Sequence, residues 1–90
     1  MKLCMIGTGY VGLVSGTCFA DIGHTVYCAD KNENIINKLN SCKSTIYEPG
    51  LDELINKNYK AKRLFFTSNT AEAINKSDII FICVGTPSKK

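Results

Sequence analysis

The segment Gly7-Thr8-Gly9-Tyr10-Val11-Gly12 has the spacing G-x-G-x-x-G, which binds a dinucleotide diphosphate when it joins a strand to a helix. Gly7 would permit the tight turn out of the strand, and Gly9, which has no Cβ, would let the backbone approach the diphosphate closely. Gly12 would let the helix pack near the strand. Free N–H groups and the dipole at the start of the helix would attract the phosphates.

The flanking sequence supplies the context that this motif needs. Lys2–Ile6 is a short apolar run typical of a buried strand, residues 10–22 are apolar or small, and Gly23 provides a helix stop. Thr25–Ala29 is a second strand-like run, closed by Asp30. The Asp30 carboxylate could accept hydrogen bonds from both hydroxyls of an adenosine ribose, and its charge would repel a 2′-phosphate. The pattern therefore predicts a βαβ unit that binds NAD in preference to NADP.

Two other interpretations fit parts of the glycine motif. The glycines could simply form a tight turn, with Asp30 capping the next helix. A phosphate-binding P-loop requires Lys and Ser or Thr after its last glycine, whereas Leu13 and Val14 follow Gly12 here. The sequence excludes a P-loop.

The remainder of the chain continues the alternation of strands and helices. Strands are expected at Leu64–Thr67 and Ile79–Val84, and the second of these runs is apolar enough for a strand buried on both faces. Helices are expected at 32–41, after Glu48-Pro49-Gly50, and after a cap at Ser68, Asn69 or Thr70. This order predicts an α/β fold, a Rossmann-like doubly wound parallel sheet of about four strands in the order 3-2-1-4.

That strand order would place the loops after Ile6 and Val84 on opposite sides of one ligand crevice. Thr86, with its hydroxyl and backbone N–H, is therefore predicted to contact the cofactor, although Gly85-Thr86-Pro87 could also merely end a strand. Glu48-Pro49-Gly50 is interpreted first as a helix start, with Gly50 relieving backbone strain. Nothing in its spacing connects it to the crevice.

Composition narrows the class of protein. The 90 residues carry a formal charge of +3, and the loose basic cluster Lys57, Lys60, Lys62 and Arg63 is interpreted as solvated surface without nucleic-acid binding. The five cysteines include no C-x-x-C pair and His24 is the sole histidine, so no metal site is expected. Glycines interrupt the apolar N-terminal run, which argues against a signal peptide or a transmembrane helix. We expect a cytoplasmic protein without membrane association.

Three segments together resemble the N-terminal NAD-binding domain of the UDP-glucose/GDP-mannose dehydrogenase family, and of its UDP-glucose 6-dehydrogenases in particular. They are Met5-Ile6-Gly7-Thr8-Gly9-Tyr10-Val11-Gly12-Leu13-Val14-Ser15-Gly16, Ile46-Tyr47-Glu48-Pro49-Gly50-Leu51 and Val84-Gly85-Thr86-Pro87. The first alone would fit many Rossmann proteins, but the three in this order are more restrictive. Residues 1–90 are accordingly expected to be the N-terminal portion of such a domain, with the remainder of the enzyme absent.

The resemblance implies oxidation of UDP-glucose to UDP-glucuronate by NAD⁺, through a thiohemiacetal on a cysteine, in a homo-oligomeric parent enzyme. It implies cofactor contacts at Val11, Asp30 and Thr86; with the glycine turn, the expected site is Gly7, Gly9, Tyr10, Val11, Gly12, Asp30 and Thr86. The nucleophilic cysteine lies downstream in the family, so no residue here is expected to be catalytic. Ile35 stands where the family often has a basic residue, and Lys31 or Lys38 could supply that charge instead.

Three alternatives remain open. Two are sibling enzymes that act on GDP-mannose or on a UDP-N-acetylhexosamine. The third is a regulatory NAD-sensing domain such as those that gate potassium transport, which would share the pattern of residues 2–31. The segments Tyr47–Leu51 and Gly85–Pro87 argue against the regulatory domain.

Overall fold

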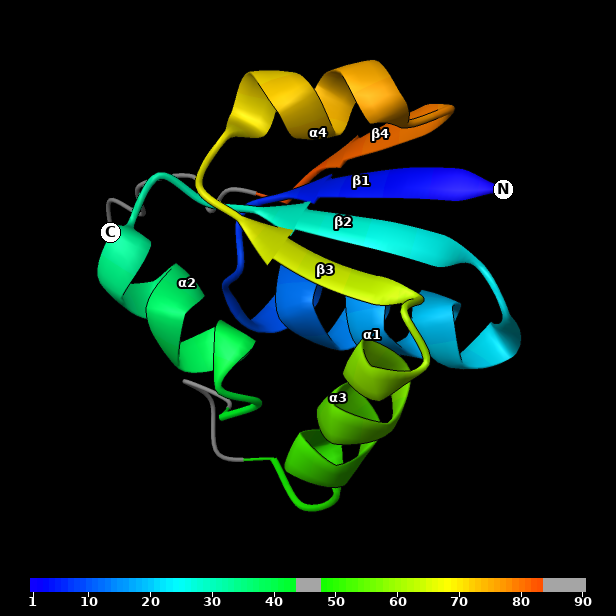
Figure 1. Cartoon of the computed structure of the whole chain (residues 1–90), viewed down its shortest axis with the longest axis vertical. Helices are drawn as coiled ribbons and strands as arrows, with labels where there is room; N and C mark the ends of the chain where they lie inside the picture. The colour runs from blue at the N-terminus through cyan, green and yellow to red at the C-terminus, as the bar shows by residue number, and fades with distance from the viewer. Residues whose placement is uncertain (44–47, 84–90) are drawn as a thin grey trace, which may run out of the picture.

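The structure, a computed structural model, describes residues 1–43 and 48–83. Over these ranges, four strands form one parallel sheet in the order β3-β2-β1-β4 (Figure 1). The predicted α/β doubly wound sheet is confirmed. The elements are β1 (Lys2–Ile6), α1 (Tyr10–Ile22), β2 (Thr25–Ala29), α2 (Glu33–Asn40), α3 (Leu51–Lys60), β3 (Leu64–Thr67), α4 (Thr70–Lys76) and β4 (Ile79–Ile82).

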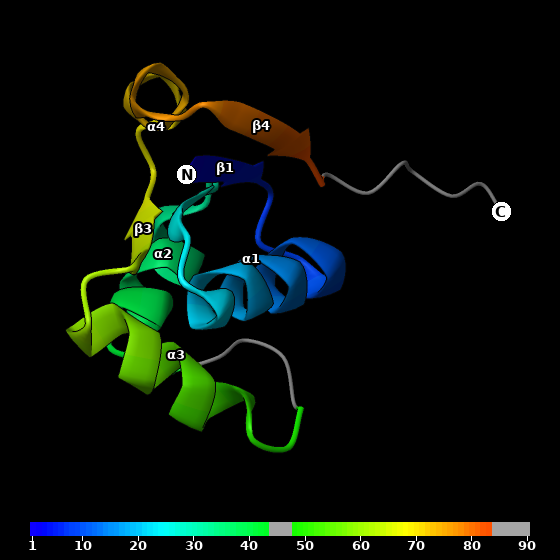
Figure 2. The same cartoon turned by 90° about the vertical axis from the view of Figure 1, so that its right-hand side faces the viewer.

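The helices cover the sheet unequally. Figure 2 shows α1, α2 and α3 on one face and α4 alone on the other. Because side chains alternate along a strand, Leu3 and Met5 of β1 join the larger core, which includes α1 residue Leu13, while Cys4 joins a smaller cluster with Ala73 of α4. The sheet is thus buried more thoroughly on the side where α1 lies.

Local capping chemistry sets the helix boundaries. Gly23 ends α1 with a φ of 124°, and its N–H donates to the carbonyls of Ala20 and Phe19. The side chain of Asn32 caps α2 by accepting from the N–H groups two and three residues later. Asn69 caps α4 by accepting from the N–H of Glu72. The structure therefore selects Asn69 from the candidate caps Ser68, Asn69 and Thr70, whereas α2 is capped by Asn32 and not by Asp30.

Strand β4 lies where the sequence predicts but is not buried as predicted. It pairs with β1, yet all four of its residues are exposed, from 36% at Phe81 to 74% at Ile82. The expectation of burial on both faces is wrong for the described residues, because β4 is the edge strand of their sheet. Phe81 does stack on Phe19 of α1. The apolar composition of β4 makes it suitable for burial, but the elements that pack against it determine how much of it is buried.

A buried polar network joins α1 to α3 and β3 at the end of α1 remote from the glycine turn. Asn58, fully buried on α3, donates to Asp21 at 3.2 Å and accepts from both Nε (3.2 Å) and Nη2 (3.0 Å) of Arg63. Arg63 Nε also lies 3.0 Å from the carbonyl oxygen of Ala20, and Lys57 pairs with Asp21 at 3.0 Å. Lys57 and Arg63, two members of the basic cluster, therefore form an ion pair and hydrogen bonds within the fold.

Replacing Asn58 with Ala should lower the free energy of unfolding by about 1–3 kcal/mol, because it leaves the buried part of the network without its central partner. Urea denaturation followed by circular dichroism measures the change. Asn37→Ala on the exposed surface of α2 is the matched control and should stay within about 0.5 kcal/mol of the parent. Equal effects of the two substitutions would show that the network contributes no particular stability.

Candidate nucleotide-binding site

The chain turns sharply between β1 and α1 at the glycine motif. Gly7 adopts a φ of 103°, in the region that favours glycine, and its N–H donates to the carbonyl oxygen of Ala29 at 2.7 Å. Gly9 is the N-cap of α1 with extended backbone and no side-chain cap. The turn therefore joins the end of β1 to the end of β2 before the helix begins.

A side chain would meet different surroundings at positions 9 and 12. A Cβ on Gly12 would overlap the carbonyl oxygen of Gly7 and lie 3.1 Å from the Cβ of Cys83, so only glycine lets α1 start this near the sheet. A Cβ on Gly9 would meet nothing within 4 Å. The fold itself therefore does not require glycine at position 9. A side chain at this position would instead occupy the open space beside the backbone and keep another molecule from approaching it.

The start of α1 is electrostatically suited to an anion. Tyr10 and Val11 are 56% and 62% exposed, and Leu13 donates to Gly9 at 2.9 Å as the first amide to reach a carbonyl of this helix. The N–H groups before it have no partner inside the helix. The first turn holds no acidic residue, whereas the first turns of α2, α3 and α4 each hold at least one.

The carboxylate of Asp30 is held on both oxygens. Its Oδ2 accepts from the N–H of Thr8 at 3.0 Å and from the Thr8 hydroxyl at 2.7 Å, and its Oδ1 accepts from the N–H of Asn32 at 2.9 Å. Partial burial raises the pKa of Asp30, but the hydrogen bonds from Asn32 and Thr8 outweigh it and bring that pKa below its ordinary value. Because Asn32 caps α2, Asp30 is not the cap of that helix.

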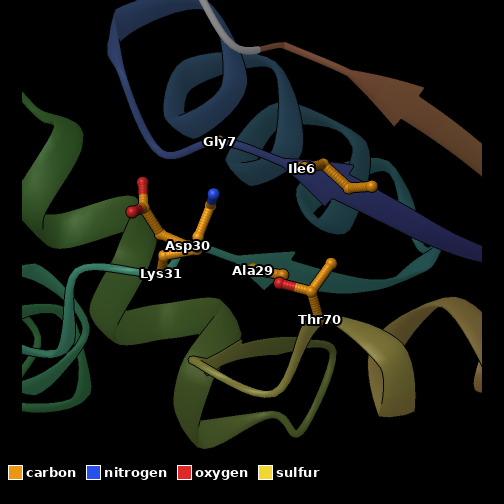
Figure 3. Close-up of a pocket in the computed structure, with 6 residues that line it drawn as sticks. All are labelled: Ile6, Gly7, Ala29, Asp30, Lys31 and Thr70. Carbon is orange, nitrogen blue, oxygen red and sulfur yellow. The ribbon is translucent and has the colours of Figure 1, made fainter.

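A pocket of about 270 Å³ opens beside Asp30 at the carboxyl ends of the strands (Figure 3). Ligands of doubly wound sheets bind at this edge, outside the strand ends. The lining comes from the ends of β1 and β2, the residues after β2 and the start of α4: Ile6, Gly7, Ala29, Asp30, Lys31 and Thr70.

The positions of the basic candidates differ. Lys31 lines this pocket, whereas Lys38 borders a separate hollow with Asn37, Ser41 and Lys43. Ile35 is partly buried and packs against the main core. Of the two lysines proposed to replace the expected basic residue, Lys31 is therefore the one at the pocket beside Asp30.

The loop before α3 reaches the start of α1. The hydroxyl of Tyr10 donates to Glu48 Oε1 at 3.3 Å, and Gly50 adopts a φ of 84° immediately before α3. The interpretation of Gly50 as a residue that relieves backbone strain is confirmed, and Glu48 gains a link to the glycine turn that its sequence spacing did not show. Tyr47 lies outside the described residues.

The end of β4 also approaches this edge. The N–H of Cys83 donates to the carbonyl oxygen of Ile6 at 2.8 Å, directly before the glycine turn. Thr86 and the rest of Val84–Pro87 lie outside the described residues, so the predicted contact of Thr86 with the cofactor stays a prediction.

Sequence reasoning overlooked Thr8. It occupies a variable position of the G-x-G-x-x-G motif, yet it is only 2% exposed and makes two hydrogen bonds to Asp30. A polar, β-branched side chain between two glycines was the available signal, but sequence alone does not reveal a partner 22 positions away.

The part of the chain that the structure describes holds neither a metal site nor a membrane-spanning helix. No group of His, Cys, Asp or Glu among residues 1–43 and 48–83 could hold a metal ion. Over the same residues, no helix has the length and apolar character required to cross a membrane. All five cysteines are free, with Cys4 and Cys28 buried; burial raises the pKa of the Cys4 and Cys28 thiols.

The chain is similar to known proteins over its whole length. Residues 1–90 match the UDP-glucose/GDP-mannose dehydrogenase family, NAD binding domain. The chain is 53% identical to UDP-glucose 6-dehydrogenase of Rhizobium meliloti (strain 1021), over 100% of the chain and 21% of that protein. It is 55% identical to UDP-glucose 6-dehydrogenase TuaD of Bacillus subtilis (strain 168), over 99% of the chain and 19% of that protein.

Solved structures agree. A GDP-mannose dehydrogenase from Pseudomonas aeruginosa, crystallised as a ternary complex, matches with a TM-score of 0.95 and 42% identity, over 100% of this chain and 21% of that one. A UDP-glucose dehydrogenase from Pyrobaculum islandicum matches with a TM-score of 0.93 and 40% identity, over 98% and 20%. The chain spans about a fifth of the length of these relatives. It belongs to the UDP-glucose/GDP-mannose dehydrogenase family, within the NAD binding domain.

Proposed function

We propose that this chain binds NAD at the carboxyl edge of its sheet. The diphosphate would lie against the start of α1 beside Gly9, where the space that a Cβ would occupy is open. The adenosine ribose would donate to the ionised carboxylate of Asp30, beside the 270 Å³ pocket. The observation that carries the proposal is the meeting of an uncapped, acid-free helix start and a fixed carboxylate at one edge.

Gly7, Tyr10, Val11, Gly12 and Thr86 complete the proposed cofactor site. Gly7 and Gly12 shape the turn, and the exposed Tyr10 and Val11 flank the space beside Gly9. Thr86 follows β4, whose end runs beside β1, so its predicted contact fits the strand order. Lys31 would supply positive charge near the adenosine.

We further propose that the parent protein oxidises UDP-glucose to UDP-glucuronate, with residues 1–90 forming the N-terminal portion of its NAD-binding domain. Bound NAD⁺ would supply the hydride acceptor, and this chain would bind and orient it. The nucleophile and the sugar-binding residues are assigned to the remainder of the protein. Support comes from the relatives named UDP-glucose 6-dehydrogenase.

The runner-up is a sibling substrate. GDP-mannose 6-dehydrogenases are 44% identical to this chain, and UDP-N-acetylmannosamine dehydrogenases share its fold at 31–32% identity. The regulatory NAD-sensing alternative receives no support from these relatives. A cytoplasmic location, consistent with the free thiols, and a homo-oligomeric parent enzyme are further parts of the proposal.

Gly9→Ala should separate binding from folding. Because its Cβ meets nothing within 4 Å and Gly9 has a φ of −72°, the melting temperature should be unchanged or slightly raised. The new methyl group would keep a diphosphate from the backbone, so the affinity of the full-length protein for NAD should fall about tenfold or more, measured by isothermal titration calorimetry.

Gly12→Ala is the matched comparison. Its Cβ overlaps the Gly7 carbonyl, so this variant should lose about 1–3 kcal/mol of stability as well as affinity. If Gly9→Ala bound NAD as tightly as the parent protein, the diphosphate would not lie where we place it.

Removal of the Asp30 charge should weaken the preference for NAD. Asp30→Asn loses the charge-assisted hydrogen bond to the ribose and the repulsion of a 2′-phosphate. The ratio of the NADP and NAD dissociation constants should therefore fall about 10- to 100-fold. Asp78→Asn is the control, because Asp78 lies at the amino ends of the strands, away from the proposed site, where it accepts a hydrogen bond from the N–H of Lys2. An unchanged ratio in Asp30→Asn would contradict the role given to this carboxylate.

A further inference from the structure

We propose that Thr8 is a positioning residue that fixes the Asp30 carboxylate for the adenosine ribose and so contributes to the preference for NAD over NADP. The inference rests on the proposed function, since it concerns the same cofactor site. Thr8 occupies the first variable position of the G-x-G-x-x-G motif, for which the spacing of the motif specifies no residue type.

The contact between the two residues is short and shielded. The Thr8 hydroxyl lies 2.7 Å from Asp30 Oδ2, and the Thr8 N–H donates to the same oxygen at 3.0 Å. Thr8 is only 2% exposed, so water competes little for these bonds. Hydrogen bonds to an ionised acceptor are roughly twice as strong as neutral ones. Thr8 therefore ties the turn after β1 to the end of β2 through a charge-assisted pair.

The acceptor sites of the carboxylate define what remains for a ligand. A carboxylate offers about four lone-pair sites. Thr8 occupies two on Oδ2, and the N–H of Asn32 occupies one on Oδ1. Figure 3 shows the carboxylate of Asp30 pointing toward the turn that follows Gly7. Rotating it away would break both Thr8 contacts, so Oδ1 stays in one orientation with capacity for a further donor.

A carboxylate held in one orientation favours NAD over NADP. A ribose hydroxyl of NAD donates to an acceptor that is already in place. The binding free energy is more favourable as a result, because no side chain needs to be ordered on binding. The 2′-phosphate of NADP is an anion and gains nothing from that carboxylate. Loss of the Thr8 hydroxyl should therefore weaken NAD binding and leave NADP binding nearly unchanged. A residue that only packs the glycine turn would affect both cofactors equally.

The test compares Thr8→Val, which removes the hydroxyl at nearly constant volume, with Thr8→Ser, which keeps it. Calorimetric titration of the full-length protein with NAD should show about a 3- to 10-fold loss of affinity in Thr8→Val and less than about a 2-fold change in Thr8→Ser. NADP affinity should change by less than about 2-fold in both variants. Thr8→Ala, a second variant without the hydroxyl, serves if Thr8→Val does not fold, as judged by its melting temperature.

The pKa of Asp30 gives a readout that needs no cofactor. Carbon-13 NMR of its carboxyl carbon should show a higher pKa in Thr8→Val than in the parent, because a bond to the charged form is lost, and Thr8→Ser should restore the parent value. Unchanged NAD affinity in Thr8→Val, or an equal loss for both cofactors, would overturn the inference. A parent protein that binds no NAD would instead overturn the proposed function, and an unshifted Asp30 pKa in Thr8→Val would still reject the positioning role.

Discussion

The close approach of α1 to the end of β1 is the constraint on which the site depends. A Cβ at Gly12 would overlap the carbonyl oxygen of Gly7, so the helix can start here only because position 12 lacks a side chain. That approach brings the helix amides to the carboxyl edge of the sheet. It also places Thr8 within hydrogen-bond distance of Asp30, which joins the two sides of the proposed cofactor site.

Local signals made most of the fold predictable. Apolar runs and helix stops lie within a few residues of the structure they determine, so the strands, α1 and the glycine termination of α1 follow from short segments. The strand order follows from the alternation of strands and helices together with right-handed crossovers. The cap of α4 was less determined, because Ser68, Asn69 and Thr70 can each accept the same bond and only backbone geometry selects Asn69.

Features that depend on distant pairs could not be predicted in the same way. Thr8 and Asp30 are separated by 22 positions and Tyr10 and Glu48 by 38, and sequence spacing does not give the distance between such side chains. The exposure of β4 is a further example. Its apolar run fits a buried strand, but burial requires neighbours, and in the described residues its sheet partner is β1.

The last turn of α1, remote from the glycine turn, is joined to neighbouring elements by hydrogen bonds. Asn58 and Arg63 hold the last turn of α1 against α3 and the start of β3, while the absence of a side chain at Gly12 lets its first turn lie close to the end of β1. A shift of α1 along the sheet would break the hydrogen bonds at its last turn. These contacts set where the amides at the start of α1 lie relative to the Asp30 carboxylate, the two groups that the proposed cofactor site uses. Relatives named for different nucleotide sugars share this backbone, which fits a segment that handles the step their reactions have in common.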